Sequence, residues 1–487
     1  MKVAIVYPPL DSQKGTPLLS QNRQFQYFKE PTYIYPVVPA TAATLLKNEG
    51  YEVIWLDGIA EEISYKKFLE IIQKERPDLI ALETKTPVIK QHWKIINELK
   101  QLYNPLIVLF GDHVTALPEE SFENSKVDFV LTGGDYDFLL LNLCRNLKKF
   151  STGYSLLNTE LEPGIYFRED GQIKSTGKFQ LIHDLDTLPF IDRELTKWHL
   201  YAYKNGNYKY TPGAYIMSGR DCWWGKCSFC SWPILYPKFR IRDVDNVLDE
   251  IGYLVESYRI REIMDDTGTF PVGDWLRKFC QGMIQRGYHK EIFLNCNMRF
   301  GALTFEDFKL MKKANFRLLL FGLESANQNT LERINKNLTV DKIIEDCKLA
   351  RKAGLFPHIT IMFGYPWEDY EDALRTLRLG GWLLKKGYAY TVQATLVIPY
   401  PGTPLFKECR ENNWLKTLDW EHFDMKEPVM KTPIPDKVLM RLVQEIYRVS
   451  FHPQFLYNRL KTIRDFQDLL YFKRAGIKVL GHIKDFS

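Results

Sequence analysis

The feature that most constrains the fold of this 487-residue chain is a repeated alternation of short apolar runs with helical patterns. In residues 1–150, apolar runs of strand length are separated by segments whose apolar residues recur at helical spacing. This order is typical of a doubly wound parallel sheet, because parallel strands need a helical crossover between them. The expected strands are residues 3–7, 53–56, 79–82, 106–110 and 129–131, with helices that include 61–73 and 91–102.

The carboxyl ends of these strands are where such a sheet binds its ligands. They read YPP, DG, ETKT, GDHVT and TGG, and are rich in Gly, Thr and carboxylates, which favours a cofactor-binding edge. The turn after the first strand lacks the G-x-G-x-x-G glycines that seat a dinucleotide pyrophosphate. A plain NAD-binding role is therefore disfavoured.

A second alternation starts near residue 214 and contains six strand-helix repeats, which predicts an open, partial parallel barrel whose polar strand ends meet at one mouth. The expected helices are residues 244–258, 272–286, 305–314, 341–353 and 368–386. Between the two alternations, Asp170-Gly171 is typical of a hairpin turn. The predicted division is a first domain (1–150), a linker with a hairpin (151–205), the barrel (206–415) and a helical domain (416–487).

The helical domain combines aromatic and basic residues at helical spacing. They are Phe455, Tyr457, Phe466, Tyr471 and Phe472 with Arg459, Lys461, Arg464, Lys473 and Arg474. We favour a helical cap on the barrel with a solvated basic face. The alternative is a basic amphipathic helix that contacts a membrane surface or a lipid-like substrate.

Composition excludes several classes of protein. The apolar runs fall short of the roughly 18 residues of a membrane span, and the start shows no secretory signal, so we expect a cytoplasmic protein. A net charge of +5, from 65 basic and 60 acidic residues, gives no reason to expect nucleic-acid binding. Eight cysteines in so long a chain do not form a disulfide framework.

Three of the cysteines form a C-x4-C-x2-C set, Cys222, Cys227 and Cys230. Structural zinc sites are built from two ligand pairs, and only one C-x2-C is present. A plant-type ferredoxin has this spacing, but its next thiol here, Cys280, lies in an apolar helical stretch. The third interpretation is a 4Fe-4S cluster held by three thiolates, with the fourth iron open to an amine and carboxylate ligand.

At this point the sequence resembles the radical S-adenosylmethionine (SAM) enzymes. The resemblance rests on the cysteine loop with Phe229 before its last Cys, and on MDDTGTF, NMRFG, FGLESANQNTLERINK, GYPWEDYEDALRT and IPYPGTPLF in that order along the predicted barrel. The first domain, with GDHVTALPEE and VDFVLTGGDYDFLLLNL, is similar to the cobalamin-binding domain that precedes the barrel in one subgroup. Together these motifs cover about residues 1–410.

The resemblance implies three cofactors: a 4Fe-4S cluster, S-adenosylmethionine and cobalamin. The implied cluster ligands are Cys222, Cys227 and Cys230. The implied S-adenosylmethionine contacts are Phe229, Asp265, Asp266, Arg299 and Glu324. The implied cobalamin contacts are Tyr7, Asp57, Thr84, Gly111, Asp112, Thr132 and Gly133. The alternative for Arg299 and Glu324 is a structural salt bridge across the barrel mouth.

Two departures from the family pattern stand out. The usual radical loop is C-x3-C-x2-C, so this loop must bulge around Trp223 and Trp224. The D-x-H-x-x-G motif that supplies a histidine to cobalt is also absent, since Asp112 directly precedes His113. The resemblance therefore implies cobalamin without a histidine beneath the metal.

The resemblance implies a radical C-methyltransferase. The alternatives are a cobalamin-dependent cyclase, rearrangement or coupling enzyme, and a sensor without turnover. We assign no catalytic residue, and expect a small-molecule, lipid or peptide substrate with an external electron donor such as flavodoxin or ferredoxin. The aromatic residues at the mouth, which line a substrate pocket or pack a barrel rim, are Trp223, Trp224, Trp232, Trp367 and Tyr400.

Overall fold

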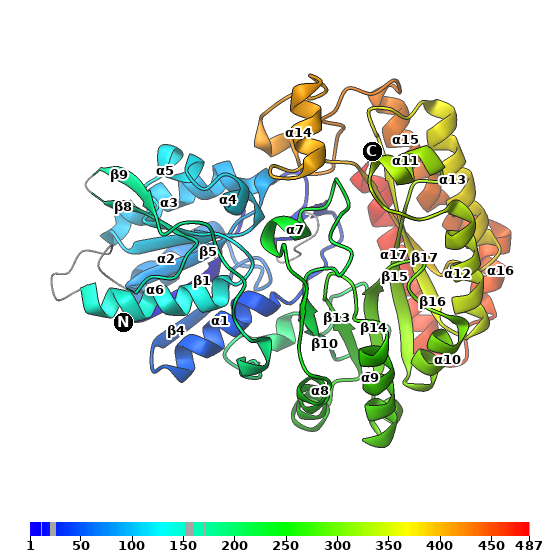
Figure 1. Cartoon of the computed structure of the whole chain (residues 1–487), viewed down its shortest axis with the longest axis horizontal. Coiled ribbons are helices and arrows are strands. Elements are labelled where there is room, and N and C mark those ends of the chain that lie inside the picture. The colour runs from blue at the N-terminus through cyan, green and yellow to red at the C-terminus, as the bar shows by residue number, and fades with distance from the viewer. Residues whose placement is uncertain (11, 20–25, 151–159, 170, 487) are drawn as a thin grey trace.

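The computed structural model describes residues 1–10, 12–19, 26–150, 160–169 and 171–486. It contains two large sheets that lie side by side, each with its own helices (Figure 1). The predicted α/β class, with a doubly wound domain, a partial barrel and a helical C-terminal part, is confirmed.

The first sheet has the strand order β4-β1-β5-β6-β7-β8-β9. Its first five strands are parallel, which is the order 2-1-3-4-5 of a flavodoxin-like sheet. These strands are β1 Lys2–Tyr7, β4 Glu52–Asp57, β5 Leu79–Glu83, β6 Leu106–Phe110 and β7 Phe129–Leu131. The helices are α1 Val37–Asn48, α2 Tyr65–Glu75, α3 Ile89–Tyr103, α4 Asp112–Ala116, α5 Glu120–Asn124 and α6 Tyr136–Phe150. A short antiparallel pair, β2 Thr16–Pro17 and β3 Tyr27–Phe28, lies apart from this sheet.

Both faces of this sheet are buried, which explains why its strands are apolar along their whole length. Ala4 and Val6 of β1 contribute to one core, whereas Val3 and Ile5 contribute to the other. Side chains alternate between the faces of a strand, so a strand with both faces covered has no polar positions to mark its register.

The predicted hairpin forms, but it belongs to the first sheet. Strands β8 Ile165–Glu169 and β9 Gln172–Ser175 pair antiparallel, and β8 continues the sheet beside β7. Gly171 has a φ of 75°, a left-handed conformation that glycine adopts without a steric penalty. Asp170, the other predicted turn residue, lies outside the described residues.

The second sheet has the order β10-β13-β14-β15-β16-β17, and all neighbours are parallel. The strands are β10 Gly213–Ile216, β13 Glu262–Asp265, β14 Phe293–Met298, β15 Phe316–Glu324, β16 Phe356–Phe363 and β17 Thr391–Leu396. The connecting helices are α8 Val244–Tyr258, α9 Asp274–Gln285, α10 Phe305–Lys313, α11 Gln328–Arg333, α12 Val340–Lys352 and α13 Tyr370–Lys385. Strand β10 does not pair with β17, so the predicted open barrel of six strand-helix units is confirmed.

Capping residues fix where several of these helices begin. Asp243 caps α8, and Thr304 and Asp369 form capping boxes at α10 and α13. Each cap satisfies helix N–H groups that have no intrahelical partner.

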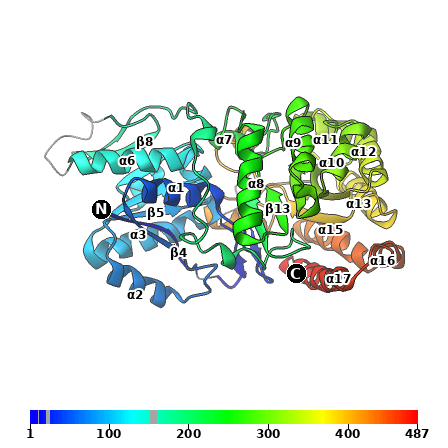
Figure 2. The ribbon, with the colours of Figure 1, turned by 90° about the horizontal axis from the view of Figure 1, so that it is seen from below.

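The remaining elements connect and cover the barrel. They are β11 Gly219–Arg220, β12 Arg240–Ile241, α7 Trp232–Leu235, α14 Pro404–Glu411, α15 Asp436–Arg448, α16 Pro453–Leu460 and α17 Phe466–Asp485. Helix α15 packs against β17, where the Tyr447 hydroxyl accepts from Ala394 N at 2.9 Å. Helices α16 and α17 lie along the outer edge of the barrel half (Figure 2). Among the described helices, none has the length and apolarity needed to cross a bilayer.

Candidate active site at the mouth of the barrel

The cysteine loop, residues 222–230, follows β11 and lies where the barrel strands end. Backbone and side-chain hydrogen bonds tie it to other elements. Ser228 N donates to Ile334 O at 3.0 Å, and Trp224 Nε1 donates to Asn335 O at 2.9 Å. Leu405 N, at the start of α14, donates to Ser228 O at 2.9 Å. The loop is therefore held by the segments that follow β15 and β17.

The three thiols of this loop form no disulfide and are partly buried. Cys222 Sγ lies 2.9 Å from Thr269 Oγ1, and Cys230 N donates to Cys227 O at 3.2 Å. Burial raises the pKa of the Cys227 thiol, against the opposing effect of the Lys336 ammonium. Within the described ranges, no three His, Cys, Asp or Glu side chains are grouped closely enough to hold a single metal ion.

Trp223 and Trp224, the residues of the predicted bulge, contact Arg299. The guanidinium lies 4.3 Å from the centre of the Trp224 ring and 5.8 Å from that of Trp223. These are cation-π distances. Asp221 and Gly225 flank the pair with φ of 83° and 58°. The longer loop thus places two indole rings on the arginine that follows β14.

Arg299 and Glu324 do not form the salt bridge that we considered as an alternative. Arg299 donates to backbone oxygens instead, to Phe300 O at 3.1 Å, Asn337 O at 3.3 Å and Lys336 O. Glu324 Oε1 accepts from Lys336 Nζ at 2.7 Å, and both side chains are about nine-tenths buried. Sequence analysis did not select Lys336, although it is the last residue of the quoted FGLESANQNTLERINK motif.

The end of β15 has the unusual backbone that this ion pair needs. Glu324 has a φ of 64°, and the β15–β16 register shifts between Gly322 and Glu324. A Cβ on Gly322 would lie 2.1 Å from Glu324 Oε1 and 2.6 Å from Lys336 Nζ. Glycine at this position is therefore required for the carboxylate and ammonium to meet.

The other predicted S-adenosylmethionine contacts differ in burial and in the contacts that they already make within the protein. Asp265 is buried, and its carboxylate already accepts from Ser218 N and Thr267 N, each at 3.0 Å. Asp266, at the same strand end, is also buried. The Phe229 ring lies 5.9 Å from Lys336 Nζ. Asp265 thus shapes the end of β13, whereas Phe229 lies beside the Glu324–Lys336 pair.

The mouth also holds buried polar atoms without hydrogen-bond partners in the described part of the chain. They are Asp221 Oδ1, Trp223 Nε1, Ser228 Oγ, Ser231 Oγ and Arg299 Nε. Buried polar groups are normally satisfied, and unsatisfied groups at one place are typical of a ligand site. Three thiols suit an iron-sulfur cluster, and a paired ammonium and carboxylate with a nearby guanidinium suit an amino-acid ligand. The residues present therefore fit both groups.

The predicted cobalamin contacts lie at the carboxyl edge of the first sheet, where most of their side chains bond within the protein. Tyr7 donates to Glu83, and Thr84 Oγ1 lies 2.8 Å from His92 Nδ1. Asp57 accepts from Ala60 N at 2.9 Å and from Tyr201 OH at 2.6 Å.

The remaining contacts at this edge also shape the backbone. Thr132 Oγ1 donates to Gly164 O at 2.8 Å, and Asp112 accepts from His113 N at 2.8 Å. Gly111 has a φ of 129°, and a Cβ there would lie 2.2 Å from Thr84 O. Gly133 likewise has a φ of 81°.

Two buried polar atoms at this edge have no hydrogen bond among the described residues, Glu83 Oε1 and Lys85 Nζ. They lie 3.6 Å apart, and the Lys85 side chain is 2% exposed. His113 lies between Thr86 Oγ1 at 3.1 Å and Glu120 Oε2 at 3.0 Å. The edge therefore fits a polar ligand, while both His113 ring nitrogens already have partners.

The aromatic residues that were predicted to line one substrate pocket lie in different surroundings. Trp232 is 1% exposed and packs in the core, where a Cβ on Gly268 would lie 2.0 Å from its Nε1. Tyr400 is buried, and Trp367 stacks against Arg333 at 4.0 Å. Only Trp223 and Trp224 lie in the cysteine loop.

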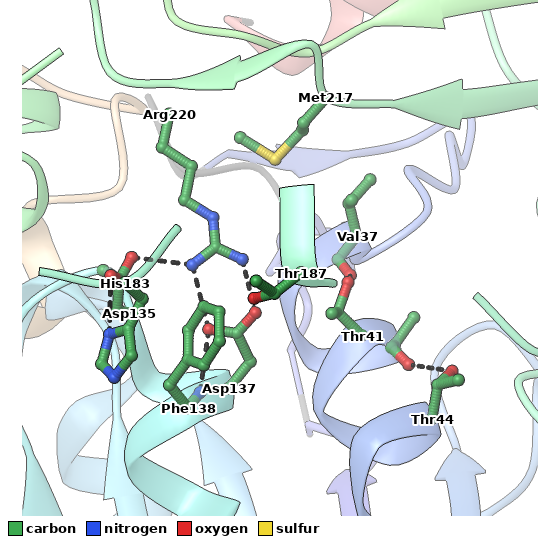
Figure 3. Close-up of polar contacts among 12 residues, drawn as sticks. Val37, Thr41, Thr44, Asp135, Asp137, Phe138, His183, Thr187, Met217 and Arg220 are labelled. Atoms are coloured by element: carbon green, nitrogen blue, oxygen red, sulfur yellow. Dashed lines mark hydrogen bonds and ion pairs between the residues drawn. The ribbon is translucent and has the colours of Figure 1, made fainter. Parts of the chain in front are cut away.

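A buried charge cluster joins the first domain to the barrel beside this site (Figure 3). This seam cluster consists of Asp135 and Asp137 at the start of α6, His183, and Arg220 and Arg240 of β11 and β12. Arg220 Nη1 donates to Asp135 at 2.7 Å and to Asp137 at 3.0 Å. Arg240 Nη1 donates to Asp135 at 2.8 Å. Sequence analysis missed this cluster because its members are far apart in the chain.

The fold and this site together define a class: a parallel partial barrel with a three-thiol loop at its mouth, preceded by a flavodoxin-like ligand-binding domain. Comparison with protein families agrees. Residues 216–380 match the Radical SAM superfamily, and residues 32–138 match the B12 binding domain. The chain therefore contains a radical SAM domain preceded by a B12-binding domain, and these two domains imply a 4Fe-4S cluster, S-adenosylmethionine and cobalamin.

Named relatives span most of the chain. An uncharacterized methyltransferase of Pyrococcus horikoshii is 26% identical over 426 residues, which cover 86% of this chain and 87% of that protein. The anaerobic magnesium-protoporphyrin IX monomethyl ester cyclase of Cereibacter sphaeroides is 28% identical over 81% of this chain and 63% of its own length. The relatives thus include both a methyltransferase and a cyclase.

Solved structures share the whole fold. The radical S-adenosylmethionine methyltransferase TsrM of Kitasatospora setae, with cobalamin and a [4Fe-4S] cluster bound, has a TM-score of 0.69 at 14% identity and covers 99% of both chains. The cobalamin-dependent enzyme OxsB, with aqua-cobalamin and S-adenosylmethionine bound, also has a TM-score of 0.69 at 14% identity, over 99% of this chain and 71% of its own. At this identity the similarity concerns the fold.

Proposed function

We propose that this protein is a cobalamin-dependent radical SAM enzyme that methylates a carbon of its substrate. The observation that carries the proposal is the position of the three loop cysteines, the Glu324–Lys336 pair and Arg299 at the mouth of a barrel that follows a B12-binding domain. When bound, the cofactors supply an electron that splits S-adenosylmethionine into methionine and a 5′-deoxyadenosyl radical, and a methyl group for the substrate radical.

In this proposal the residues of the mouth have separate roles. Cys222, Cys227 and Cys230 would hold the cluster, which would supply the electron for the reaction. Lys336 and Arg299 would bind the carboxylate of the ligand, and Glu324 would bind its amine. A zwitterion bound between such groups forms charge-assisted hydrogen bonds at both ends, which fixes its orientation.

The first domain presents its carboxyl edge to the cobalamin. Gly111 and Gly133 let the backbone of this edge pack against Thr84 and Phe179, and the buried, ion-paired Glu83 Oε1 and Lys85 Nζ make no hydrogen bond among the described residues, which leaves them able to bond a polar ligand. Because His113 has partners on both ring nitrogens, the proposal includes no histidine ligand to cobalt.

A second candidate function is a radical cyclase, favoured by the 28% identity to the Cereibacter sphaeroides cyclase over 81% of this chain. The two candidates differ in their coproducts. Methyl transfer consumes a second S-adenosylmethionine as methyl donor and releases S-adenosylhomocysteine, whereas cyclisation without methylation does not.

Anaerobic reconstitution tests both candidates. The protein is loaded with iron, sulfide and cobalamin, then mixed with S-adenosylmethionine and a reductant, and 5′-deoxyadenosine and S-adenosylhomocysteine are measured by chromatography. A methylase releases both products. Release of 5′-deoxyadenosine alone would favour the cyclase, and absence of 5′-deoxyadenosine from cluster-loaded protein would overturn the radical mechanism.

A further inference from the structure

A second charged cavity lies at the opposite end of the barrel from the cysteine loop. Its volume is about 540 Å³. Phe293, Arg317 and Phe356, at the starts of β14, β15 and β16, form its roof, and residues of α16 and of the segment that leads into α17 form its floor. Barrel enzymes place their chemistry at the other end, so this basic cavity has no role in the proposed reaction.

The walls of the basic cavity carry far more positive than negative charge. Eight cations line it, Lys209, Lys312, Arg317, Arg351, Lys386, Arg459, Lys461 and Arg464, against two acids, Asp465 and Asp468. Lys209 pairs with Asp468, and Arg317 pairs with the buried Glu262 at 2.6 Å. The other six cations form no ion pair with any described residue. Asp465 instead caps α17, where it accepts from Asp468 N at 2.8 Å.

Two of the arginines are buried with unused donors. Arg459 is 8% exposed, its guanidinium lies 3.5 Å from the centre of the Tyr390 ring, and its Nη2 has no acceptor in the described part of the chain. Arg317 is 2% exposed, and its Nη1 has no acceptor among the described residues. Burial, reinforced by the neighbouring cations, also lowers the pKa of Lys312. Unpaired buried charge is costly, and an anion in the cavity would remove that cost.

The helices that close this cavity expose apolar side chains on their outer side. Of thirteen exposed large apolar side chains in the described part of the chain, eight lie between residues 451 and 480. They are Phe451, Tyr457, Leu460, Phe466, Leu469, Leu470, Ile477 and Leu480. In α17, Phe466, Leu470, Ile477 and Leu480 recur at helical spacing and form one stripe, with exposed fractions from 44% to 71%.

This combination identifies the partner. An exposed apolar stripe on a helix beside excess cations matches the interface of an anionic membrane, where apolar side chains enter the acyl region and cations meet phosphates. A second copy of this chain fits poorly, because two such surfaces would bring two cation-rich cavities together. The cations Arg459, Lys461 and Arg464 lie close in the chain to the exposed Leu460 and Phe466, so the floor of the basic cavity and the apolar stripe belong to adjoining segments.

We propose that the α16–α17 surface docks on an anionic phospholipid membrane, with a phosphate-bearing headgroup in the basic cavity and the α17 stripe in the acyl region. This arrangement places the protein on a membrane by one edge, the edge that α16 and α17 occupy in Figure 2. The proposal does not rest on methyl transfer, because it concerns a surface remote from the cysteine loop.

Vesicle flotation tests the proposal on the full chain. Vesicles of phosphatidylglycerol mixed with phosphatidylcholine are compared with vesicles of phosphatidylcholine alone. We expect binding to the anionic vesicles that weakens as salt rises, since surface charge is screened. Equal binding to both vesicle types, or binding to neither, would overturn the proposal.

Two sets of variants separate the apolar and the charged contributions. The combined variant Phe466→Gln, Leu470→Gln and Ile477→Gln is expected to lose at least about tenfold in vesicle partitioning. Lys461→Gln and Arg464→Gln are expected to lose about fivefold each at low salt. All these side chains are exposed, and thermal unfolding checks that each variant folds.

Matched controls come from exposed residues elsewhere. Ile182→Gln and Leu418→Gln replace apolar side chains that are 68% and 55% exposed, and Lys407→Gln removes an exposed charge. The controls are expected to bind vesicles like the unaltered protein. The competing occupant of the α17 surface is a second copy of this chain, and size-exclusion chromatography tests it. If the unaltered protein is a dimer, the α17 variant is a monomer and neither binds vesicles, the proposal is overturned in favour of self-association.

Discussion

The seam cluster and the barrel mouth are neighbouring buried polar regions with opposite hydrogen-bonding patterns. In the seam, Arg220 and Arg240 meet Asp135 and Asp137, and the charges of the two arginines and two aspartates balance. At the mouth, Arg299 Nε and four other buried polar atoms lack partners in the described residues. Both regions are built from elements far apart in the chain.

This difference in hydrogen bonding indicates a structural role for the seam and a ligand-binding role for the mouth. In the seam the protein supplies carboxylate partners for both arginines, although Arg240 Nε makes no hydrogen bond among the described residues, so charge can hold the two domains together without a ligand. At the mouth, where several buried donors and acceptors make no hydrogen bond among the described residues, we expect bound groups to supply the missing partners. Substitutions should therefore affect stability at the seam and ligand binding at the mouth.

The largest expected effect is at the mouth. Cys227→Ala is expected to abolish both retention of iron and release of 5′-deoxyadenosine, because two thiols and a water cannot hold a cluster as three thiolates do. Iron analysis and chromatography measure the two quantities. Cys347→Ala, at a buried thiol of α12, is the control and should retain both. Iron retention by Cys227→Ala would contradict the assignment of this cysteine.

At the seam, Arg220→Met should destabilise the folded protein by about 3–5 kcal/mol, because it leaves buried carboxylates without their cation. Denaturant unfolding measures the change. Arg286→Met is the control: its partners Asp245 and Asp249 are largely exposed, so a loss of at most about 1 kcal/mol is expected. Equal losses in the two variants would show that the seam cluster does not hold the domains together.

The seam also predicts a pH dependence through His183. Burial alone would lower its pKa, but hydrogen bonds with Asp135 and Glu162 outweigh burial and raise the pKa from 6.5 to about 9. Arg240 also contacts this segment, through His183 O at 3.0 Å. The shift corresponds to about 3 kcal/mol of stability from the charged form.

A raised pKa means that this stability is fully present below about pH 6.5 and is lost as the pH rises through about 9. The unfolding free energies of the unaltered protein and His183→Gln should therefore differ most at the acid end and converge at the alkaline end. Urea unfolding across this range measures the difference. A gap that is constant with pH would refute the charged state of His183.

The smallest expected effect sharpens the role of Lys336. Lys336→Met should raise the Kd for S-adenosylmethionine about tenfold, because the ligand carboxylate loses a charge-assisted contact. Adding Glu324→Gln should restore stability, since no unpaired carboxylate remains, but not affinity. Lys342→Met, which removes a partly exposed lysine paired with Glu345, is the control. Unchanged affinity in Lys336→Met would limit Lys336 to a structural role.

Much of the fold could be predicted because apolar periodicity is a local property. The strands at 106–110 and 129–131 have the predicted bounds, since each is an apolar run of strand length with turn or polar residues at its ends. The hairpin around Gly171 was also predicted. Its pairing with β7 was not, because strand partners are chosen by tertiary packing.

The candidate site also has features that could be predicted from the sequence and features that could not. The three cysteines, Arg299 and Glu324 lie in recognisable motifs, so their types and positions could be selected from the sequence. The pairing of Glu324 with Lys336, the stacking of Arg299 on Trp224 and the burial of Trp232 could not. Each depends on side-chain directions at strand ends and in loops, which no periodic pattern encodes.

The sequence by itself determined the order of the domains, the barrel type and the residue types available for chemistry, because these follow from short-range patterns. Only the tertiary structure decided which charges are paired. Arg220 finds Asp135 and Asp137 across 85 and 83 residues, whereas Arg459 and Arg464 line a cavity with too few acids. Charge pairing depends on distance and burial, and both are set when remote segments pack together.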